Sequence, residues 1–278
     1  MLPTTPAEEL ADFITRHPRL VVLTGAGVST DSGIPAYRDK LGNWRHAPPV
    51  QHKEFMQKQI ARQRFWARSL AGWPFIRDAQ PSAAHTALAE LEKLGHVDLL
   101  ITQNVDRLHQ KAGSHHVIDL HGRADEVKCM DCGNRYGRND IHNTSLSENP
   151  QFELPDTDVA SRPDGDADIE SENVTKFNVP ECRSCGGVLK PDVVYFGDNV
   201  PKETVFNALD CLEEADALLT VGSSLMVYSG FRFCKKAVEW NKPIAALNLG
   251  VTRADQLLSL KLNADISGTL QKTTDLLK

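Results

Sequence analysis

Short apolar runs alternate with helical segments along most of this 278-residue chain, and this alternation constrains its fold more than any other feature. Strands are expected at 20–23, 98–102, 117–120, 217–221 and 243–249, and helices near 53–70, 85–94, 106–111, 202–214 and 230–240. The first helix begins with a capping box, in which Thr5 precedes Pro6 and Glu8 lies three residues beyond Thr5. Strands that alternate with helices predict an α/β fold with a doubly wound parallel sheet.

The alternation is interrupted where two C-x-x-C pairs flank a polar segment. The four cysteines are Cys129, Cys132, Cys182 and Cys185. Six cysteines in all are too few for a disulfide-stapled secreted chain, and such pairs indicate a metal site before a redox or disulfide function. Four thiolates suit tetrahedral Zn²⁺ with no open position for catalysis. The expected boundaries are 123–197 for an inserted small zinc-binding lobe, 10–122 and 198–275 for the larger lobe, and about 34–80 for a helical insertion in the latter.

Charge is distributed unevenly along the chain. The formal net charge is −6, but residues 140–181 alone carry 11 acidic and two basic residues, which leaves 29 basic and 26 acidic residues elsewhere. This acidic insert is typical of a solvated surface loop, with an acidic docking surface as the alternative. Neither a nucleic-acid partner nor a membrane is expected, because the net charge is negative and no long apolar run is present. The start of the chain lacks the pattern of a signal or transit peptide, so a cytoplasmic protein is expected.

A glycine-rich turn, Gly25-Ala26-Gly27, follows the first apolar strand. Such a turn lets the backbone approach a pyrophosphate, as in Rossmann-like nucleotide-binding lobes. Thr30 stands where the hydride-transfer fingerprint has its third glycine, no acidic residue ends a second strand about 20 residues on, and no Gly-Lys-Ser/Thr follows. The turn therefore predicts dinucleotide binding without the signature of a hydride-transfer enzyme.

Further motifs extend this pattern over residues 10–275. They are Gly25-Ala26-Gly27-Val28-Ser29-Thr30-Asp31-Ser32-Gly33-Ile34-Pro35-Ala36-Tyr37-Arg38-Asp39, Thr102-Gln103-Asn104-Val105-Asp106, Leu120-His121-Gly122, Lys190-Pro191-Asp192-Val193-Val194-Tyr195-Phe196-Gly197, Gly222-Ser223-Ser224-Leu225 and Asn248-Leu249-Gly250. In this order, with the cysteine pairs between them, they resemble the signature of the sirtuins, the NAD-dependent protein deacylases. The resemblance implies that the whole chain, 1–278, is a single catalytic region.

The resemblance also implies a reaction and a set of site residues. Sirtuins cleave NAD to nicotinamide and transfer the acyl group of an acyl-lysine protein to ADP-ribose, giving O-acyl-ADP-ribose. His121 matches the general base, for which a pKa near neutrality is expected, and Asn104 and Asp106 complete the catalytic set. The implied NAD contacts are Gly25, Ala26, Gly27, Thr30, Ile34, Pro35, Tyr37, Arg38, Gln103, Asn104, Val105, Asp106, His121, Gly222, Ser223, Ser224, Asn248, Leu249, Gly250 and Ile266. The cysteine pairs are implied to hold a structural Zn²⁺ that folds the small lobe.

Finer motifs resemble the class II branch that contains mitochondrial sirtuin four, among them Gly72-Trp73-Pro74 and Val227-Tyr228-Ser229-Gly230. Related enzymes that remove acidic acyl groups carry Tyr-x-x-Arg, and this chain has Phe65-x-x-Arg68. Arg68 is expected to contact an acyl carboxylate or to form a structural salt bridge. Acetyl, lipoyl and methylglutaryl groups all fit this pattern better than a strict preference for succinyl. The segment Val193, Val194, Tyr195 and Phe196 is expected to offer a strand edge to an acyl-lysine peptide.

Two other functions share these residues. A protein mono-ADP-ribosyltransferase also cleaves NAD but modifies a protein side chain, and a non-catalytic reader would bind NAD or acyl-lysine without turnover. The intact His121, Asn104 and Asp106 argue against the reader. The sequence defines neither the protein substrate nor the acyl group, and a monomer is the expected state.

Overall fold

Six parallel strands form the larger of two sheets, in the order β3-β2-β1-β7-β8-β9. The computed structural model describes residues 4–45, 49–152 and 174–278. The strands are β1 (Leu20–Thr24), β2 (Val97–Thr102), β3 (Val117–Asp119), β7 (Ala217–Val221), β8 (Ile244–Leu247) and β9 (Leu260–Leu262). Strand order runs outward from β1 to β3 and then restarts on the other side of β1 with β7. This reversal is the switch point of a doubly wound sheet, where the carboxyl ends of the strands open a crevice.

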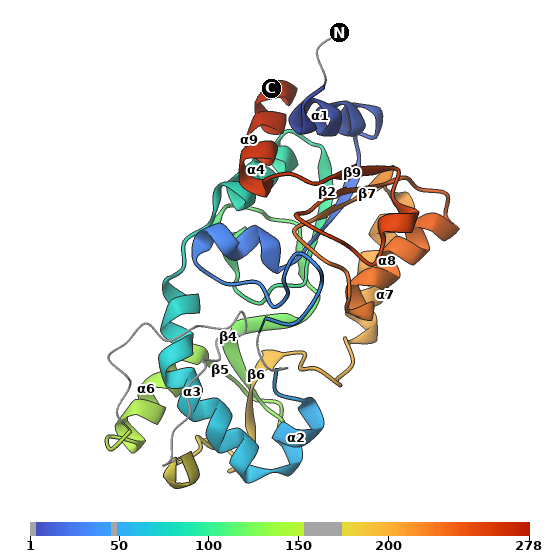
Figure 1. Cartoon of the computed structure of the whole chain (residues 1–278). Helices are drawn as coiled ribbons and strands as arrows, with labels where there is room; N and C mark the ends of the chain where they lie inside the picture. The colour runs from blue at the N-terminus through green and yellow to red at the C-terminus, as the bar shows by residue number, and fades with distance from the viewer. Residues whose placement is uncertain (1–3, 46–48, 153–173) are drawn as a thin grey trace.

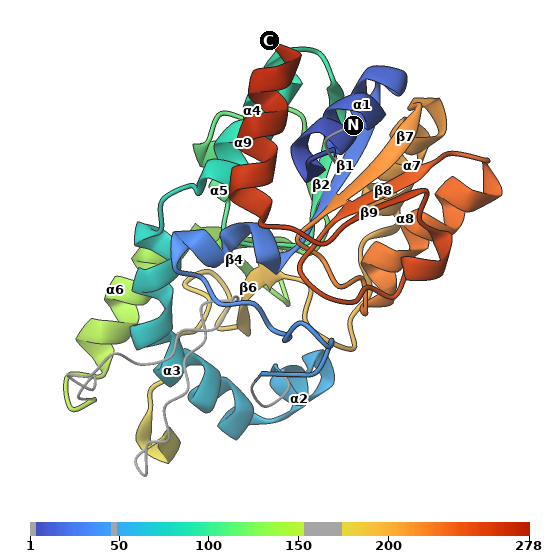
Figure 2. The same ribbon diagram turned by 45° about the horizontal axis from the view of Figure 1, so that its top comes forward.

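Helices cover both faces of this sheet (Figures 1 and 2). Helices α1 (Pro6–Arg16), α4 (Ala83–Lys93) and α9 (Ile266–Leu277) pack on one face, and α7 (Lys202–Glu214) and α8 (Tyr228–Glu239) on the other. Along β1, Leu20 and Val22 join the first core while Val21 and Leu23 join the second, as the two-residue period of a strand requires. The α/β fold with a doubly wound parallel sheet is confirmed, as is the Thr5 capping box of α1.

The second sheet is antiparallel and has the order β5-β4-β6. Its strands are β4 (Gly122–Cys129), β5 (Arg135–Gly137) and β6 (Leu189–Val193), and its helices are α2 (His52–Gln57), α3 (Gln59–Asp78) and α6 (Arg138–Glu148). One hydrophobic core joins Phe65, Trp66 and Trp73 of α3 to Val127 of β4 and Leu189 of β6. Helices from two places in the chain therefore cover the small sheet: α2 and α3 come from the 34–80 stretch, and α6 follows directly after β5. The lobe boundaries given above stay a prediction.

The helix expected near 53–70 is two helices in the structure. Lys58 adopts extended dihedrals, with φ −116° and ψ 120°, and separates α2 from α3. Helix α3 then continues through Pro74 to Asp78, because Trp73 and Ile76 are buried in the small-lobe core on either side of the proline. The remaining short helices are η1 (Ala26–Ser32), α5 (Leu108–Lys111), η2 (Val174–Lys176) and η3 (Asp255–Leu257).

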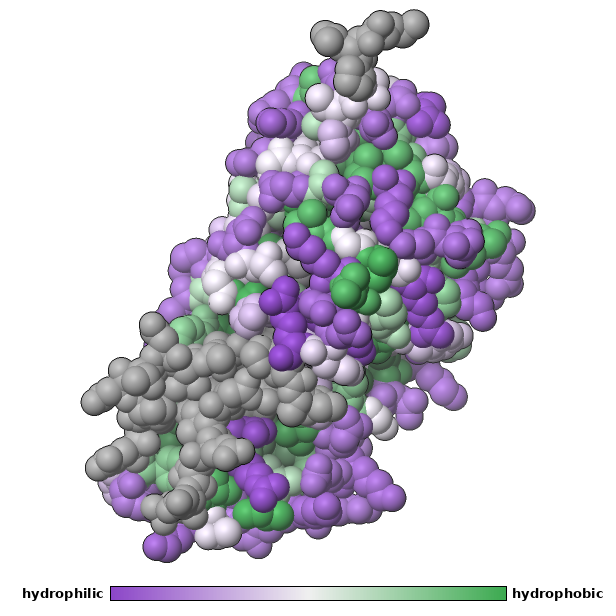
Figure 3. Space-filling model, in the orientation of Figure 1, coloured by the Kyte–Doolittle hydropathy of each residue, from purple (hydrophilic) through white to green (hydrophobic). Residues whose placement is uncertain are grey.

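The surface drawn in Figure 3 is mainly hydrophilic, with smaller apolar areas between the polar side chains. Within 4–45, 49–152 and 174–278, no helix has the length and apolar character needed to cross a bilayer. Half of the acidic insert predicted at 140–181 lies outside the described residues, since 153–173 belongs to none of these ranges.

Candidate active site

A pocket of about 640 Å³ opens at the carboxyl ends of the large-sheet strands, on the side that faces β6. Segments that follow β1, β2, β3, β7 and β8 each contribute to its wall, and residues 193–200 close it from the small lobe. Its volume lies within the range of small-molecule and cofactor sites. The predicted residues that line it are Gly25, Ala26, Gly27, Thr30, Ile34, Tyr37, Arg38, Gln103, Asn104, Val105, Asp106, His121, Val193, Val194, Tyr195, Phe196, Gly222, Ser223, Ser224, Asn248, Leu249 and Ile266.

Two glycine turns meet at the floor of the pocket. The Gly27 N–H donates to the Gly222 carbonyl (2.8 Å), and a Cβ on Gly27 would lie 2.8 Å from the Gly222 Cα. Gly222 has φ +63°, a conformation that an L side chain rarely adopts. The turns after β1 and β7 therefore touch through their backbones, and a glycine on each side of the contact permits this close approach.

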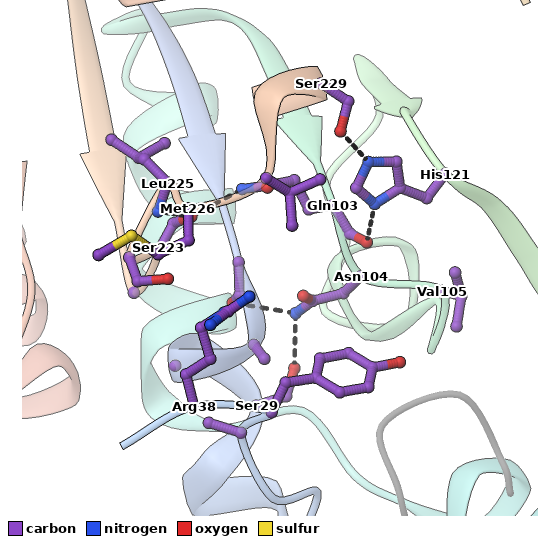
Figure 4. Close-up of a pocket in the computed structure, with 18 of the residues that line it drawn as sticks. Ser29, Arg38, Gln103, Asn104, Val105, His121, Ser223, Leu225, Met226 and Ser229 are labelled. Atoms are coloured by element: carbon purple, nitrogen blue, oxygen red, sulfur yellow. Dashed lines mark hydrogen bonds between the residues drawn. The ribbon is translucent and has the colours of Figure 1, made fainter. Parts of the chain in front are cut away.

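A polar cluster follows β2 and contacts the first glycine turn (Figure 4). The Asn104 amide donates to the Gly25 carbonyl (3.1 Å) and to Ser29 Oγ (3.0 Å), and Ser29 Oγ donates to Asp106 Oδ2 (2.7 Å). Burial raises the pKa of Asp106, while hydrogen bonds from the Leu108 N–H and Ser29 act in the opposite direction. The cluster is thus a fixed arrangement of amide, hydroxyl and carboxyl groups around the turn of β1.

His121 stands at the junction of the two lobes, directly before β4. Its Nδ1 lies 2.9 Å from the Gln103 carbonyl oxygen and its Nε2 lies 2.7 Å from Ser229 Oγ (Figure 4). Burial lowers the pKa of His121 to about 4, so the expectation of a value near neutrality is wrong for this structure. The imidazole is neutral at pH 7, which is the state that a general base requires.

An aromatic cluster joins the loop after η1 to the segment after β6. Tyr37 and Trp44 both contact Phe196 edge-on, with ring centroids 6.3 Å and 5.5 Å away. The Arg38 guanidinium lies 3.9 Å above the Trp44 ring and donates to the Gly42 carbonyl (2.7 Å). This packing holds a cationic group at the pocket wall.

The segment after β6 is less open than expected. Strand β6 is an edge of its sheet, and the Val194 N–H donates to the His121 carbonyl (2.8 Å). The Phe196 carbonyl accepts a hydrogen bond from the His52 N–H (2.8 Å), so α2 already pairs with part of this edge. The free backbone edge is therefore shorter than the predicted stretch from Val193 to Phe196.

Four of the residues predicted to contact NAD or the acyl substrate lie outside the pocket lining: Pro35, Phe65, Arg68 and Gly250. Phe65 is 1% exposed and packs on Tyr195 and Phe55, so it supports the pocket wall from behind instead of facing a ligand. Arg68 lies one turn further along the same helix. Gly250 has φ +101° and approaches the Lys40 carbonyl so closely that a Cβ would meet it at 2.1 Å. Gly250 therefore packs against the backbone of the loop that contains Arg38 and Lys40.

Ser29, Trp44, Ser229 and Arg232 are among the pocket residues that sequence reasoning missed. Ser29 and Ser229 lie within the motifs 25–39 and 227–230 that resemble the family. Their hydroxyl groups could therefore have been recognised as candidate site residues. Trp44 and Arg232 had no comparable signal, because their positions depend on how distant segments pack.

The four paired cysteines come together at the far end of the small sheet. Their sulfur atoms all lie within 4.8 Å of one another, with 3.6 Å between Cys129 and Cys185 and 3.7 Å between Cys132 and Cys182. A tetrahedral Zn²⁺ with sulfurs at about 2.3 Å places those sulfurs about 3.8 Å apart, so the four thiols fit this ion. None of them lines the pocket, which separates the metal site from the candidate chemistry.

The fold and the site together define a nucleotide-binding protein in which a zinc-type lobe completes the pocket. Comparison with known proteins is consistent with this class. The sequence model of the Sir2 family matches residues 25–229. The chain belongs to this family.

Relatives and solved structures match over nearly the whole chain. The chain is 54% identical to the NAD-dependent protein deacetylase 2 of Bradyrhizobium diazoefficiens over 92% of this chain and 93% of that protein. It is 49% identical to the NAD-dependent protein deacylase SIR4 of Monosiga brevicollis over 90% and 81% of the two chains, which supports the class II branch. A solved Sir2–p53 peptide–NAD⁺ structure superposes with a TM-score of 0.77 at 30% identity, covering 97% of both chains.

Proposed function

We propose that this protein is an NAD-dependent protein-lysine deacylase that uses His121 as its general base. One observation carries the proposal: the Gln103 carbonyl binds Nδ1 of His121, and the other ring nitrogen lies at the pocket wall. A carbonyl oxygen only accepts hydrogen bonds, so Nδ1 bears the proton and Nε2 carries a lone pair. The imidazole is therefore neutral and has its basic nitrogen on the side of the bound substrates.

NAD, when bound, supplies the electrophilic ribose carbon and the nicotinamide leaving group. The two contacting glycine turns would approach its phosphates, and the Arg38 cation would offset their charge. The Asn104–Ser29–Asp106 cluster offers the amide and carboxyl groups that suit the nicotinamide carboxamide. Ser223 and Asn248 lie at the ends of β7 and β8, where ribose contacts are expected.

The acyl-lysine peptide would bind along Val193 and Val194, between His121 and the large lobe. The pocket wall there joins the end of β6 to the start of α8, so an extended peptide would lie across both lobes. Backbone pairing gives affinity with little dependence on the peptide sequence. The four cysteines would hold Zn²⁺, and its function would be to fix the sheet that carries this peptide segment.

The proposal is tested by mixing the protein with NAD and acyl-lysine peptides and identifying the products by mass spectrometry. We expect free lysine, nicotinamide and O-acyl-ADP-ribose in equal amounts. His121→Ala should reduce net deacylation by about 10²- to 10⁴-fold, because general base catalysis contributes a factor of that size, while circular dichroism and NAD affinity stay close to wild type. ADP-ribosylated protein without O-acyl-ADP-ribose, or wild-type kinetics in His121→Ala, would overturn the proposal.

The same assay addresses the acyl group. Peptides that carry acetyl, succinyl, methylglutaryl, lipoyl or long-chain acyl groups are compared by kcat/KM, in wild type and in Arg68→Met. We propose acetyl and the larger lipoyl or methylglutaryl groups as substrates. An acyl preference that Arg68→Met leaves unchanged would assign Arg68 to packing only.

We also propose that the protein acts as a cytoplasmic monomer. No disulfide joins any of the six cysteines, and four of them are gathered to hold Zn²⁺, which suits a reducing compartment. Light scattering during size-exclusion chromatography would give the oligomeric state, and cell fractionation the compartment.

A further inference from the structure

The first turn of α8 reaches across the pocket to the side chain of His121. Ser229 is the second residue of this helix, and its Oγ lies 2.7 Å from Nε2, although the two residues are 108 positions apart in sequence. In Figure 4 the Ser229 hydroxyl and the Gln103 carbonyl bind opposite nitrogens of the same ring. Both ring nitrogens of His121 are thus held by the larger lobe, one by the segment after β2 and the other by α8.

The direction of the Ser229 hydrogen bond follows from the tautomer. Because Nδ1 bears the proton that is donated to Gln103, Nε2 of the neutral ring accepts, and the Ser229 hydroxyl donates. A nitrogen of this kind has one lone pair in the plane of the ring. A second donor therefore binds Nε2 only after the Ser229 hydroxyl has left it.

Gly230, the residue after Ser229, contacts the residue that binds the other nitrogen of the His121 ring. Gly230 packs against the Gln103 side chain, and a Cβ there would lie 2.6 Å from Gln103 Oε1. The Gln103 amide in turn donates to the Thr24 carbonyl (3.1 Å) and to Ser223 Oγ (2.8 Å). Helix α8 therefore contacts both His121 and the residue whose carbonyl selects its tautomer.

We infer that Ser229 is a positioning residue for His121: its hydroxyl occupies Nε2 in the free enzyme and gives up that position to the substrate hydroxyl when NAD binds. The inference rests on the proposed function and deepens it. In the chemical step, the substrate O–H bond breaks and an Nε2–H bond forms, so His121 becomes an imidazolium that still donates from Nδ1 to Gln103. Ser229 keeps its own proton throughout.

This arrangement has a measurable electrostatic consequence. A hydrogen bond donated to Nε2 stabilises the neutral imidazole only, so it favours a lower pKa of His121. The charged and titratable groups that line the pocket on the elements around the ring include Arg38, Asp106, Asp198, Tyr228 and Arg232. Among the described residues, Arg232 is the one whose charge acts on His121, and it also lowers the pKa. Ser229 can be removed without changing any of these groups.

The test compares Ser229→Ala with Ser229→Thr, which retains a hydroxyl, and with Ser147→Ala on an exposed turn of α6 as a matched control. The pKa of His121 is measured in the unliganded protein by NMR of its ring proton, assigned with His121→Gln. We expect the pKa to rise by about 0.5 to 1 pH unit in Ser229→Ala, the size of one neutral hydrogen bond. Ser229→Thr and Ser147→Ala should match wild type.

The pH dependence of kcat/KM and of kcat then distinguishes a positioning residue from a proton relay at Ser229. The acid limb of kcat/KM for NAD, measured at saturating peptide, reports the enzyme before NAD binds, and the acid limb of kcat reports the bound complex. Ser229→Ala should move the first limb to higher pH and leave the second in place. A shift of both limbs with a lower kcat would indicate a proton relay and overturn the inference.

No change in the His121 pKa in Ser229→Ala would also overturn it. If His121→Ala keeps wild-type net deacylation, the proposed function fails instead. The NMR result stands apart from that outcome, because it requires no turnover.

Discussion

His85 offers a quantitative test of how burial governs this fold. Its side chain is fully buried behind the pocket, where Nδ1 accepts a hydrogen bond from the Ser82 N–H (3.1 Å). Burial lowers its pKa from 6.5 to about 4. In the unfolded chain the same imidazole takes up a proton near pH 6.5, so the unfolded state binds more protons between pH 6.5 and pH 4. The stability that His85 contributes is present above pH 6.5 and is lost as the pH falls through this window.

The expected size of the effect follows from the two pKa values. Between pH 7 and pH 5, protonation of the unfolded chain at this one histidine should lower the free energy of unfolding by about 2 kcal/mol. For a chain of this size that corresponds to a Tm lower by about 4 to 8 °C. Glutamine does not titrate, so the free energy of unfolding of His85→Gln should fall by about 2 kcal/mol less than that of wild type between pH 7 and pH 5. This difference does not depend on the stability of the variant at pH 7.

The assay is urea unfolding and thermal melting of both proteins at pH 7.0, 6.0, 5.5 and 5.0. His115→Gln is the matched control, because His115 is exposed and should show the wild-type pH dependence. Burial also raises the pKa of Asp106 and lowers that of His109 in both proteins, so the result is taken as the difference in pH dependence between wild type and His85→Gln. Equal pH dependence in wild type and His85→Gln would refute the argument from burial.

Two further predictions concern the backbone contact and the metal site. Gly27→Ala should lower the free energy of unfolding by about 1 to 3 kcal/mol and raise KM for NAD, because its Cβ would lie 2.8 Å from the backbone of Gly222. Unchanged stability and KM would show that the two turns can separate without cost. Removal of Zn²⁺ by a chelator, or Cys185→Ser, should unfold the small lobe and lower deacylation at least 10-fold, whereas Cys211→Ser on α7 should leave zinc content and activity unchanged. Zinc content by mass spectrometry and peptide turnover measure both, and full activity in the zinc-free protein would contradict a structural function.

Local patterns predicted the parts of the fold that depend on neighbours in sequence. The Thr5–Glu8 capping box, the apolar run at β1 and the two C-x-x-C pairs each describe an element or a ligand pair that is complete within a few residues. Gly25, Asn104, Asp106 and Ser223 line one pocket, because parallel strands bring their carboxyl ends to one edge of the sheet.

Features that depend on distant packing were not available from the sequence. The pKa of His121 is lowered chiefly by burial, which depends on how distant segments pack, so its residue type and motif gave the wrong value. Phe65 faces the small-lobe core because α3 packs there. Helix α3 is buried on most of its sides, so the spacing of its residues does not show which of them reach a ligand. Ser229 contacts His121 only through the docking of α8.

The discontinuous construction of the small lobe has a consequence for synthesis on the ribosome. Helix α3 ends at Asp78, but β6, which completes the core that buries Trp66 and Trp73, begins at Leu189. At about 5 to 20 residues per second, this delay lasts on the order of 5 to 20 s. Throughout that interval the aromatic face of α3 packs against an incomplete core, which contains α6 but lacks the side chains of β6. Binding of a chaperone to this face during translation would be the natural safeguard against aggregation of the unfinished enzyme.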